Sequence, residues 1–399
     1  MGILIRRKHE NFVYTGMVKL AIIFFIVSLA ASLIDTIWAV YLNGFLHNAS
    51  SVGFFSSFLS LLAFVSAFML VPFIEKSNKP VLYSICLLLS AVFNVIFAIN
   101  KNFLVFVLIA ILITLVSVVR IITRGIIVKD GSKKKSLSKS EGIVFSVNNV
   151  AWVIGPLIAG FVLVEVGIPY VFSLSAILVL IGFLLFRMTN VKNPKNNKKF
   201  DGNAMKNFVD YFRNKDRVII YMMTMGISFW WVLIYLYIPL FIIEKGLNKG
   251  LIGIFLFLVA IPLILSEYPL SKIAGKRGAK ALFSIAYGSL IAICLIIFFV
   301  KSFYLILGLL VLASFSLAML EPTTEAYFFD ITSKDGNENK FYGPYNTSLE
   351  IGFILGKVIP AIILIFLPFN YIFLAFALFF LFLFFLSFKA RKIIEDGKS

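Results

Sequence analysis

Seven charged side chains lie inside long apolar stretches of the chain. Their presence in such surroundings needs a functional or structural explanation. An ionised side chain at the centre of a membrane helix costs roughly 2.5 to 3.5 kcal/mol on insertion scales, so such residues usually serve a solute pathway, a gate or a buried ion pair. The seven residues are Asp35, Arg120, Glu267, Glu321, Glu325, Glu350 and Lys357.

Asp35 is the candidate for proton or cation coupling. A carboxyl group in a low-dielectric crevice can take up and release a proton when the crevice opens to water and closes again. Trp38 and Tyr41 follow at helical spacing, one and two turns later. The same carboxyl could instead contact a solute directly or make a structural hydrogen bond.

Two pairs of opposite charge occupy equivalent positions in the two halves of the chain. Arg120 and Arg124 lie one helical turn apart, and Glu321 and Glu325 repeat that spacing in the second half. Residues related by an internal two-fold axis can meet near that axis, so we predict that the pairs close a cytoplasmic gate. A guanidinium group also matches a carboxylate or phosphate, so the arginines could instead bind an anionic solute. For Arg124 and Glu325 a simple location at the membrane interface is a third interpretation.

Further polar and aromatic residues are candidates for a solute cavity. Glu350 and Lys357 lie two turns apart on one helix face, either as a neutralised pair or as separate solute contacts. Aromatic rings near residue 230 could stack on an apolar or cationic ligand, or could simply pack in the core. The predicted cavity residues are Trp38, Asn148, Asn149, Trp230, Tyr235, Glu350 and Lys357.

The residues typical of enzymes and metal sites are sparse. His9 and His47 have no acid, serine or metal-ligand spacing around them, and Cys86 and Cys294 both fall inside apolar segments. The chain has no Gly-x-x-x-x-Gly-Lys-(Ser/Thr) sequence, which excludes an ATP-driven pump encoded in this chain alone. We therefore expect no enzyme activity, no cofactor and no metal.

The composition places the chain in a membrane. Hydrophobic residues make up 61% of the 399 residues and charged residues 14%, with a mean hydropathy of +1.00. The apolar runs are continuous, which predicts helices, since strands facing lipid would alternate. At about 20 residues per span we predict an all-α integral membrane protein with twelve transmembrane helices, at 17–43, 51–74, 80–100, 102–124, 141–164, 168–187, 217–243, 250–272, 279–300, 302–327, 343–367 and 369–388.

The formal net charge is +18, and the positions of the basic residues along the chain indicate the membrane topology. If the amino terminus is cytoplasmic, most lysines and arginines fall in the termini and cytoplasmic loops, which is the positive-inside asymmetry. This placement argues against nucleic acid as a partner and allows contact with anionic lipid headgroups. We expect a multi-pass protein of the cell membrane with both termini in the cytoplasm.

The second six segments repeat the first six, which predicts two pseudo-symmetric bundles. The predicted domains are residues 1–188, a cytoplasmic linker at 189–216, and residues 217–399. The linker is rich in Asn and Lys. Within it, Phe208, Tyr211 and Phe212 share an approximate helical face, which predicts a short helix on the cytoplasmic surface. We expect a monomer.

Several local sequences resemble the major facilitator superfamily. That family has a Gly-x-x-x-Asp-(Arg/Lys)-x-Gly-(Arg/Lys)-(Arg/Lys) signature after its second helix, where this chain has Val71, Glu75, Lys76, Asn78, Lys79 and Pro80. The family's fifth-helix Gly-Pro element resembles Gly155, Pro156 and Gly160. The resemblance implies two six-helix bundles around a central cavity. Glu75 and Lys76 could latch the cytoplasmic side of a gate, or could be solvated loop charges.

The sequence therefore predicts a secondary active transporter that moves a small solute by alternating access. Protons are the expected coupling partner, and the Gly-Pro element slightly favours export. The alternatives are an uncoupled facilitator and a non-transporting sensor or lipid-binding homologue.

Overall fold

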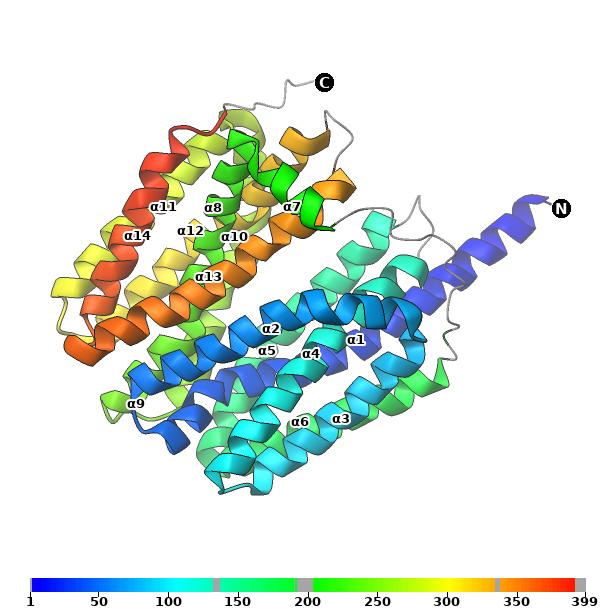
Figure 1. Cartoon of the computed structure of the whole chain (residues 1–399), viewed down its shortest axis with the longest axis horizontal. Helices are drawn as coiled ribbons and strands as arrows, with labels where there is room; N and C mark the ends of the chain where they lie inside the picture. Colours follow the sequence, from blue (N-terminus) through cyan, green and yellow to red (C-terminus); the bar gives the residue numbers. More distant parts are fainter. Residues whose placement is uncertain (1, 132–136, 190, 192–203, 334–337, 392–399) are drawn as a thin grey trace. The chain divides into compact units, whose positions relative to one another are not determined.

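The computed structural model describes residues 2–131, 137–189, 191, 204–333 and 338–391, and these residues are almost entirely helical (Figure 1). No strand occurs in the described ranges. The first half of the chain contains α1 (Gly2–Leu46), α2 (Ala49–Lys76), α3 (Lys79–Ile99), α4 (Phe103–Gly131), α5 (Leu137–Glu165) and α6 (Ile168–Met188).

The second half begins with a short helix, α7 (Ala204–Phe212). A continuous helical segment follows, made of α8 (Lys215–Val232), a π-helix η2 (Leu233–Tyr237) and α9 (Ile238–Glu244). The remaining helices are α10 (Gly250–Arg277), α11 (Ala279–Phe299), α12 (Phe303–Ser333), α13 (Glu338–Phe366) and α14 (Tyr371–Ser387).

The predicted membrane segments coincide with these helices. Ten spans in the described part of the chain are long and apolar enough to cross a membrane, and two shorter apolar helices, Gly250–Ser266 and Tyr371–Ser387, lie where two more were predicted. The all-helical multi-pass fold is confirmed, whereas the count of twelve spans stays a prediction. Helices α4 and α5 also cover 125–131 and 137–140, beyond the ends of the predicted spans 102–124 and 141–164. The lysines and serines there continue the helices, since loop-like composition does not prevent helix formation.

The described helices belong to two compact units. Unit 1 comprises Met1–Tyr41, Leu61–Asn197 and Gly246–Ile254, and unit 2 comprises Leu42–Ser60, Lys198–Lys245 and Phe255–Ser399. Each unit therefore includes a short segment from the other half of the sequence. The predicted domain boundaries at 188 and 217 stay a prediction.

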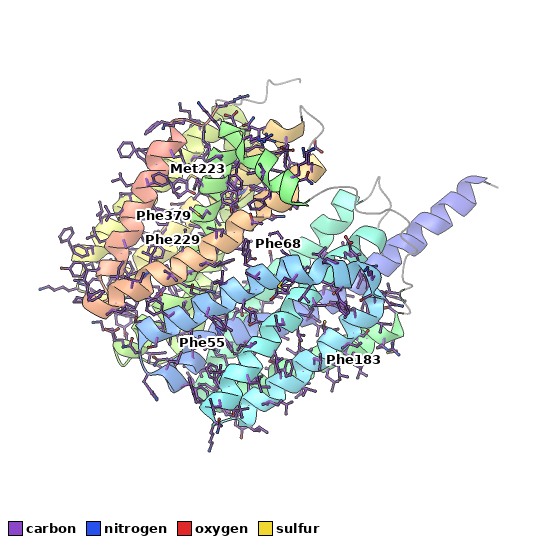
Figure 2. The ribbon with its side chains drawn as sticks, in the orientation of Figure 1. Phe55, Phe68, Phe183, Met223, Phe229 and Phe379 are labelled. Carbon is purple, nitrogen blue, oxygen red and sulfur yellow. The ribbon has the colours of Figure 1, made fainter. Side chains whose placement is uncertain are left out.

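The core of unit 1 is an apolar cluster between α1, α3 and α6. Phe24 meets Tyr83 edge-on with ring centroids 5.9 Å apart, and Tyr83 meets Phe186 at 4.8 Å. Phe183, labelled in Figure 2, packs against the same cluster. These rings hold the part of α1 around Phe24 against α3 and α6, and the Arg124 guanidinium of α4 lies 5.6 Å from the centroid of the Phe24 ring.

The core of unit 2 surrounds the segment from α8 to α9. This span is 83% buried over its most apolar window, the highest value among the described spans. Phe229 on α8 packs against Phe379 on α14 with ring centroids 4.1 Å apart (Figure 2). The Tyr287 hydroxyl of α11 donates a hydrogen bond to the carbonyl of Met223 of α8. The first span of the second half is thus the centre of its bundle.

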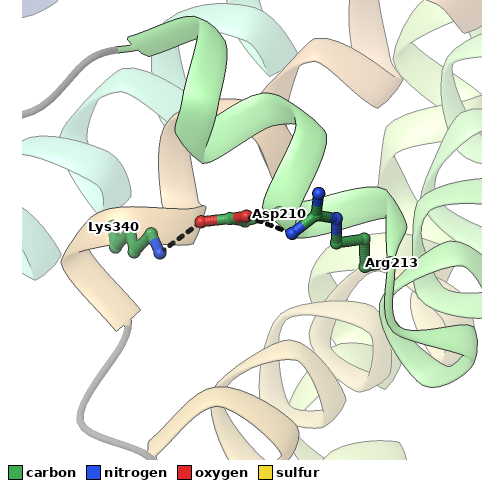
Figure 3. A network of polar contacts seen from close by, with 3 residues as sticks. All are labelled: Asp210, Arg213 and Lys340. Carbon is green, nitrogen blue, oxygen red and sulfur yellow. Dashed lines mark hydrogen bonds and ion pairs between the residues drawn. The ribbon is translucent and has the colours of Figure 1, made fainter.

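Helix α7 confirms the short helix predicted in the linker, and it is docked on unit 2. Asp210 pairs with Lys340 of α13 at 2.8 Å and with Arg213 at 3.4 Å (Figure 3). The hydrogen bond from Lys340 holds the pKa of the Asp210 carboxyl below its usual range. Tyr211 is fully buried beneath this pair. The connector is therefore attached to the second bundle through both charge and apolar contact.

A close crossing in unit 1 joins α5 to the start of α10. A Cβ added to Gly253 would lie 2.8 Å from the Gly160 Cα, and one added to Gly160 would lie 2.9 Å from the Gly253 Cα. Small residues let helix backbones approach this closely, and van der Waals packing is a main source of helix association in lipid. The Gly-Pro element of α5 therefore has a packing role.

We expect Gly253→Ala to destabilise the protein by about 1 to 3 kcal/mol, because the added methyl meets backbone that cannot rotate away. Thermal unfolding of the detergent-solubilised protein measures the effect. The matched control is Gly308→Ala in α12, where nothing lies within 4 Å of the added Cβ. Equal melting temperatures for the two variants would contradict the close crossing.

Candidate functional site

Asp35 lies on the most enclosed helix of unit 1. The α1 span is 61% buried over its most apolar window, against 22% to 50% for the other spans of the first half. From Ile23 to Tyr41 every side chain is buried or half-buried except Asp35, which is exposed. A charged residue on a membrane helix almost always faces a bundle interior or a water-filled cavity. This placement makes Asp35 a carboxyl group that water or a solute can reach.

The aromatic neighbours of Asp35 are packed together. Trp38 is half-buried, with its ring centroid 5.7 Å from Phe97 and 6.1 Å from Tyr41. The Tyr41 hydroxyl donates to the Phe97 carbonyl at 3.2 Å. Trp38 is therefore held by packing on one side and leaves part of its ring uncovered.

The two asparagines predicted to line the cavity differ in burial. Asn148 is buried, and its side-chain oxygen accepts a hydrogen bond from Ser28 of α1 at 2.9 Å. Asn149 is half-buried. Since Asn148 already joins α5 to α1, Asn149 is the better candidate for contact with a solute.

The predicted gate residues of unit 1 lie on α4 and at the end of α2. Arg120 and Arg124 are half-buried, and the Arg124 guanidinium lies 5.6 Å from the ring centroid of Phe24. Glu75 and Lys76 are both exposed at the end of α2. Within the ranges described for unit 1, none of these four residues forms an ion pair.

In unit 2 an aromatic pair faces a carboxylate. Between Met223 and Ile242 only Trp231 and Tyr235 are not buried. Their ring centroids lie 5.6 Å apart, and the Trp231 indole Nε1 donates to Glu321 Oε1 at 2.9 Å. Tyr235 lies within the π-helix η2, a local helix irregularity that is frequent at functional sites. This group is the strongest candidate for a solute contact in unit 2.

The structure places the predicted Trp230 differently from its neighbour. Trp230 is fully buried, its ring lies 6.1 Å from Phe380 of α14, and its indole N–H has no partner among the described residues. Trp231 is the tryptophan that reaches Glu321. The sequence carried a signal for this, because Trp231 and Tyr235 are four residues apart and share a helix face.

Glu325 lies one turn beyond Glu321 and is half-buried. Tyr345 of α13 is close enough to interact electrostatically with it, and Thr224 of α8 donates to the Tyr345 hydroxyl at 3.0 Å. Glu325 of α12 therefore lies near the Tyr345 hydroxyl of α13, which is itself held by Thr224 of α8.

Lys357 has a structural partner in unit 2. Its Nζ donates to Ser60 Oγ at 2.6 Å, and the Tyr237 hydroxyl donates to the Lys357 carbonyl. Glu350 is half-buried and interacts with Lys357 electrostatically, without an ion pair within 4 Å in the described residues. Lys357 therefore joins α13 to the segment 42–60, in addition to any role with a solute.

The remaining candidates are one glutamate and two cysteines. Glu267 lies in α10, and its side chain falls outside the described residues. Cys86 and Cys294 are both buried free thiols. Among the residues that the structure describes, no group of three or more His, Cys, Asp or Glu side chains could hold a metal ion.

The fold and these helices define a multi-pass membrane protein, and comparison with known families identifies the class. The profile of the Major Facilitator Superfamily matches residues 20–303 and 245–398. Because the match extends over most of its length, the chain belongs to this superfamily. No curated protein sequence matches the chain at a significant level.

Solved structures of transporters share the fold. The nucleoside transporter NupG is 14% identical, with a TM-score of 0.75 over 94% of this chain and 100% of that chain. A bacterial homologue of the human lysosomal transporter Spinster, in an inward-facing and unoccupied conformation, is 14% identical with a TM-score of 0.74, covering 95% and 96%. The peptide transporter POT in complex with sulfate is 13% identical with a TM-score of 0.71, covering 94% and 93%.

We expect Trp231→Phe to lower stability by about 1.5 to 3 kcal/mol, the size of a hydrogen bond to a charged group. A double-mutant cycle with Glu321→Met isolates this contact in thermal unfolding. The effect of Trp231→Phe should shrink when Glu321 is replaced. The effect of the control Trp230→Phe should not change. Additive Trp231 and Glu321 effects would contradict the contact.

Proposed function

We propose that this protein is a secondary active transporter that moves a small solute across the membrane by alternating access, coupled to protons. Membership of the Major Facilitator Superfamily supports the transport role. The placement of Asp35 carries the proton coupling, because it is an exposed carboxyl group on the most enclosed helix of its unit.

The proton cycle follows from the effect of solvation on the protonation of a carboxyl group. When the surroundings of Asp35 are wet, the ionised form is well solvated. When the protein closes around it, the neutral form is favoured and a proton is retained. A carboxyl that is loaded on one side of the membrane and unloaded on the other couples solute movement to the proton gradient.

The solute contacts that we propose come from both units. Trp38 and Asn149 would contribute from unit 1, and Trp231, Tyr235, Glu350 and Lys357 from unit 2. The partly uncovered Trp231 and Tyr235 rings support this assignment most directly. We place Asn148 and Trp230 in supporting positions behind these residues, since both are buried.

We propose that Arg120 and Arg124 close the cytoplasmic side by pairing with Glu321 and Glu325 in one state of the transport cycle. The equivalent positions of the two pairs in the repeat support the proposal. In this scheme Glu75 and Lys76 form a second latch at the end of α2. The direction of transport would be export, for which the Gly155–Pro156–Gly160 element gives the support.

We expect Asp35→Asn to abolish accumulation driven by a pH gradient and to leave solute exchange intact, because a neutral amide cannot carry the proton. A thermal-shift screen at two pH values first selects the solute. Uptake and counterflow in proteoliposomes then separate coupling from binding. Glu165→Gln, an exposed carboxylate at the end of α5, is the matched control. Unchanged gradient-driven uptake in Asp35→Asn would leave an uncoupled facilitator as the function.

For the gate, we expect Arg120→Glu and Glu321→Arg each to reduce transport by roughly tenfold or more, since each change places like charges opposite one another in the closed gate, a repulsion of about 1 to 4 kcal/mol at close range. The charge-swapped double variant should recover part of the lost rate, because it restores an opposite-charge pair. Initial uptake rates in proteoliposomes measure this. A double variant no more active than the worse single variant would count against the gate.

A further inference from the structure

Two arginines of α4 and a tyrosine of α3 lie near one another in unit 1. Arg120 and Arg124 lie one turn apart on α4 and are both half-buried. Both guanidinium groups lie close enough to Tyr83 of α3 for their charges to act on its hydroxyl. The ring of Phe24 connects the group, with the Arg124 guanidinium 5.6 Å from its centroid and the Tyr83 ring 5.9 Å away.

The Tyr83 hydroxyl is the distinctive member of this group. Tyr83 is fully buried, at 0% exposure, and its hydroxyl has no hydrogen-bond partner in the described part of the chain. A buried polar group without a partner is destabilising, and the great majority of such groups are paired in proteins. A fully buried phenol close to two cations points to an acceptor that binds here.

The charges of the group also require an acceptor. Two guanidinium groups one turn apart repel each other, and the repulsion is stronger in a low-dielectric region than in water. The ion pairs found within the described residues involve Asp210 or Asp216 of unit 2, and they include neither Arg120 nor Arg124. An oxyanion would neutralise the arginines and accept from all three donors.

We propose that Arg120, Arg124 and Tyr83 bind the oxyanion group of the solute, a carboxylate or a phosphate. The planar guanidinium fork matches both groups bidentately, and the phenol supplies a third donor. A neutral or cationic solute would leave the donors unsatisfied and the repulsion in place. The substrate class is therefore an organic anion.

This assignment rests on the proposed transport function. It also explains how solute binding could open the proposed gate. A guanidinium edge that holds the solute oxyanion is not available to Glu321 or Glu325. Solute binding therefore competes with the gate carboxylates for the same two side chains, so binding would favour the open gate.

The test is thermal unfolding of the purified full chain in a neutral maltoside detergent. Sodium sulfate and sodium benzoate should raise the melting temperature. Sodium chloride at matched ionic strength and benzamide, the neutral counterpart of benzoate, should not.

Arg120→Gln and Arg124→Gln should each remove the shift. Arg187→Gln, an exposed arginine at the cytoplasmic end of α6, should keep it. No shift with either anion, or an equal loss in Arg187→Gln, would overturn the proposal.

Tyr83→Phe separates a binding role from a structural one. Removing an unpartnered hydroxyl should leave the ligand-free melting temperature unchanged or higher. The same change should weaken sulfate and benzoate binding by roughly tenfold, as expected for one hydrogen bond to a charged group. A lower ligand-free melting temperature with unchanged anion affinity would mean that the hydroxyl is structural, and would overturn its part in the site.

A lipid headgroup also carries a phosphate, and a second arm distinguishes the two sources. The protein is compared in nanodiscs of phosphatidylcholine with and without phosphatidylglycerol. Stabilisation by phosphatidylglycerol, together with no response to sulfate or benzoate, would assign the site to lipid and overturn the solute proposal.

Benzoate counterflow in proteoliposomes tests transport by itself. Anion binding without counterflow would support the anion site and count against the transport function. Transport of another solute without anion binding would support the transport function and overturn the anion site.

Discussion

The structure depends on the high free energy of an unsatisfied polar group in the hydrocarbon core of a bilayer. Backbone groups meet this constraint within each helix, which is why the described residues are almost entirely helical. Side chains meet it by pairing, as Ser28 does with Asn148 and Ser60 does with Lys357. The few polar groups that remain unsatisfied, such as the Tyr83 hydroxyl, are therefore informative about function.

The same constraint explains why the two most buried spans carry the strongest candidates. The spans of α1 and of the segment from α8 to α9 are equivalent in the sequence repeat, and both are enclosed by their own bundles. Between Ile23 and Tyr41 of α1 the exposed exception is Asp35, and between Met223 and Ile242 the partly uncovered pair is Trp231 and Tyr235. A central helix has few uncovered positions, so a polar or aromatic residue at one of them faces whatever the bundle leaves open.

Packing, in contrast, uses the residues that carry no charge. Gly160 and Gly253 bring α5 and α10 into backbone contact, and Phe229 and Phe379 fill the space between α8 and α14. The aromatic residues are so numerous, with 45 phenylalanines and 15 tyrosines, that their presence at any one position says little about function. Their environment has to be known before one of them can be assigned a role.

The sequence by itself determined the membrane class, the helix positions, the short linker helix and the family. These follow from composition and from the length and period of apolar runs, which are properties of local sequence. It also indicated Asp35 and the two charged pairs, because an ionisable residue in an apolar run is conspicuous without any structure. Only the tertiary structure decided that Trp231 rather than Trp230 contacts Glu321. It also showed that Asn148 accepts a hydrogen bond from Ser28 and that Lys357 donates one to Ser60. It also revealed Tyr83, one tyrosine among fifteen. Burial and hydrogen-bond partners depend on contacts between residues far apart in the chain, and no local pattern in the sequence encodes them.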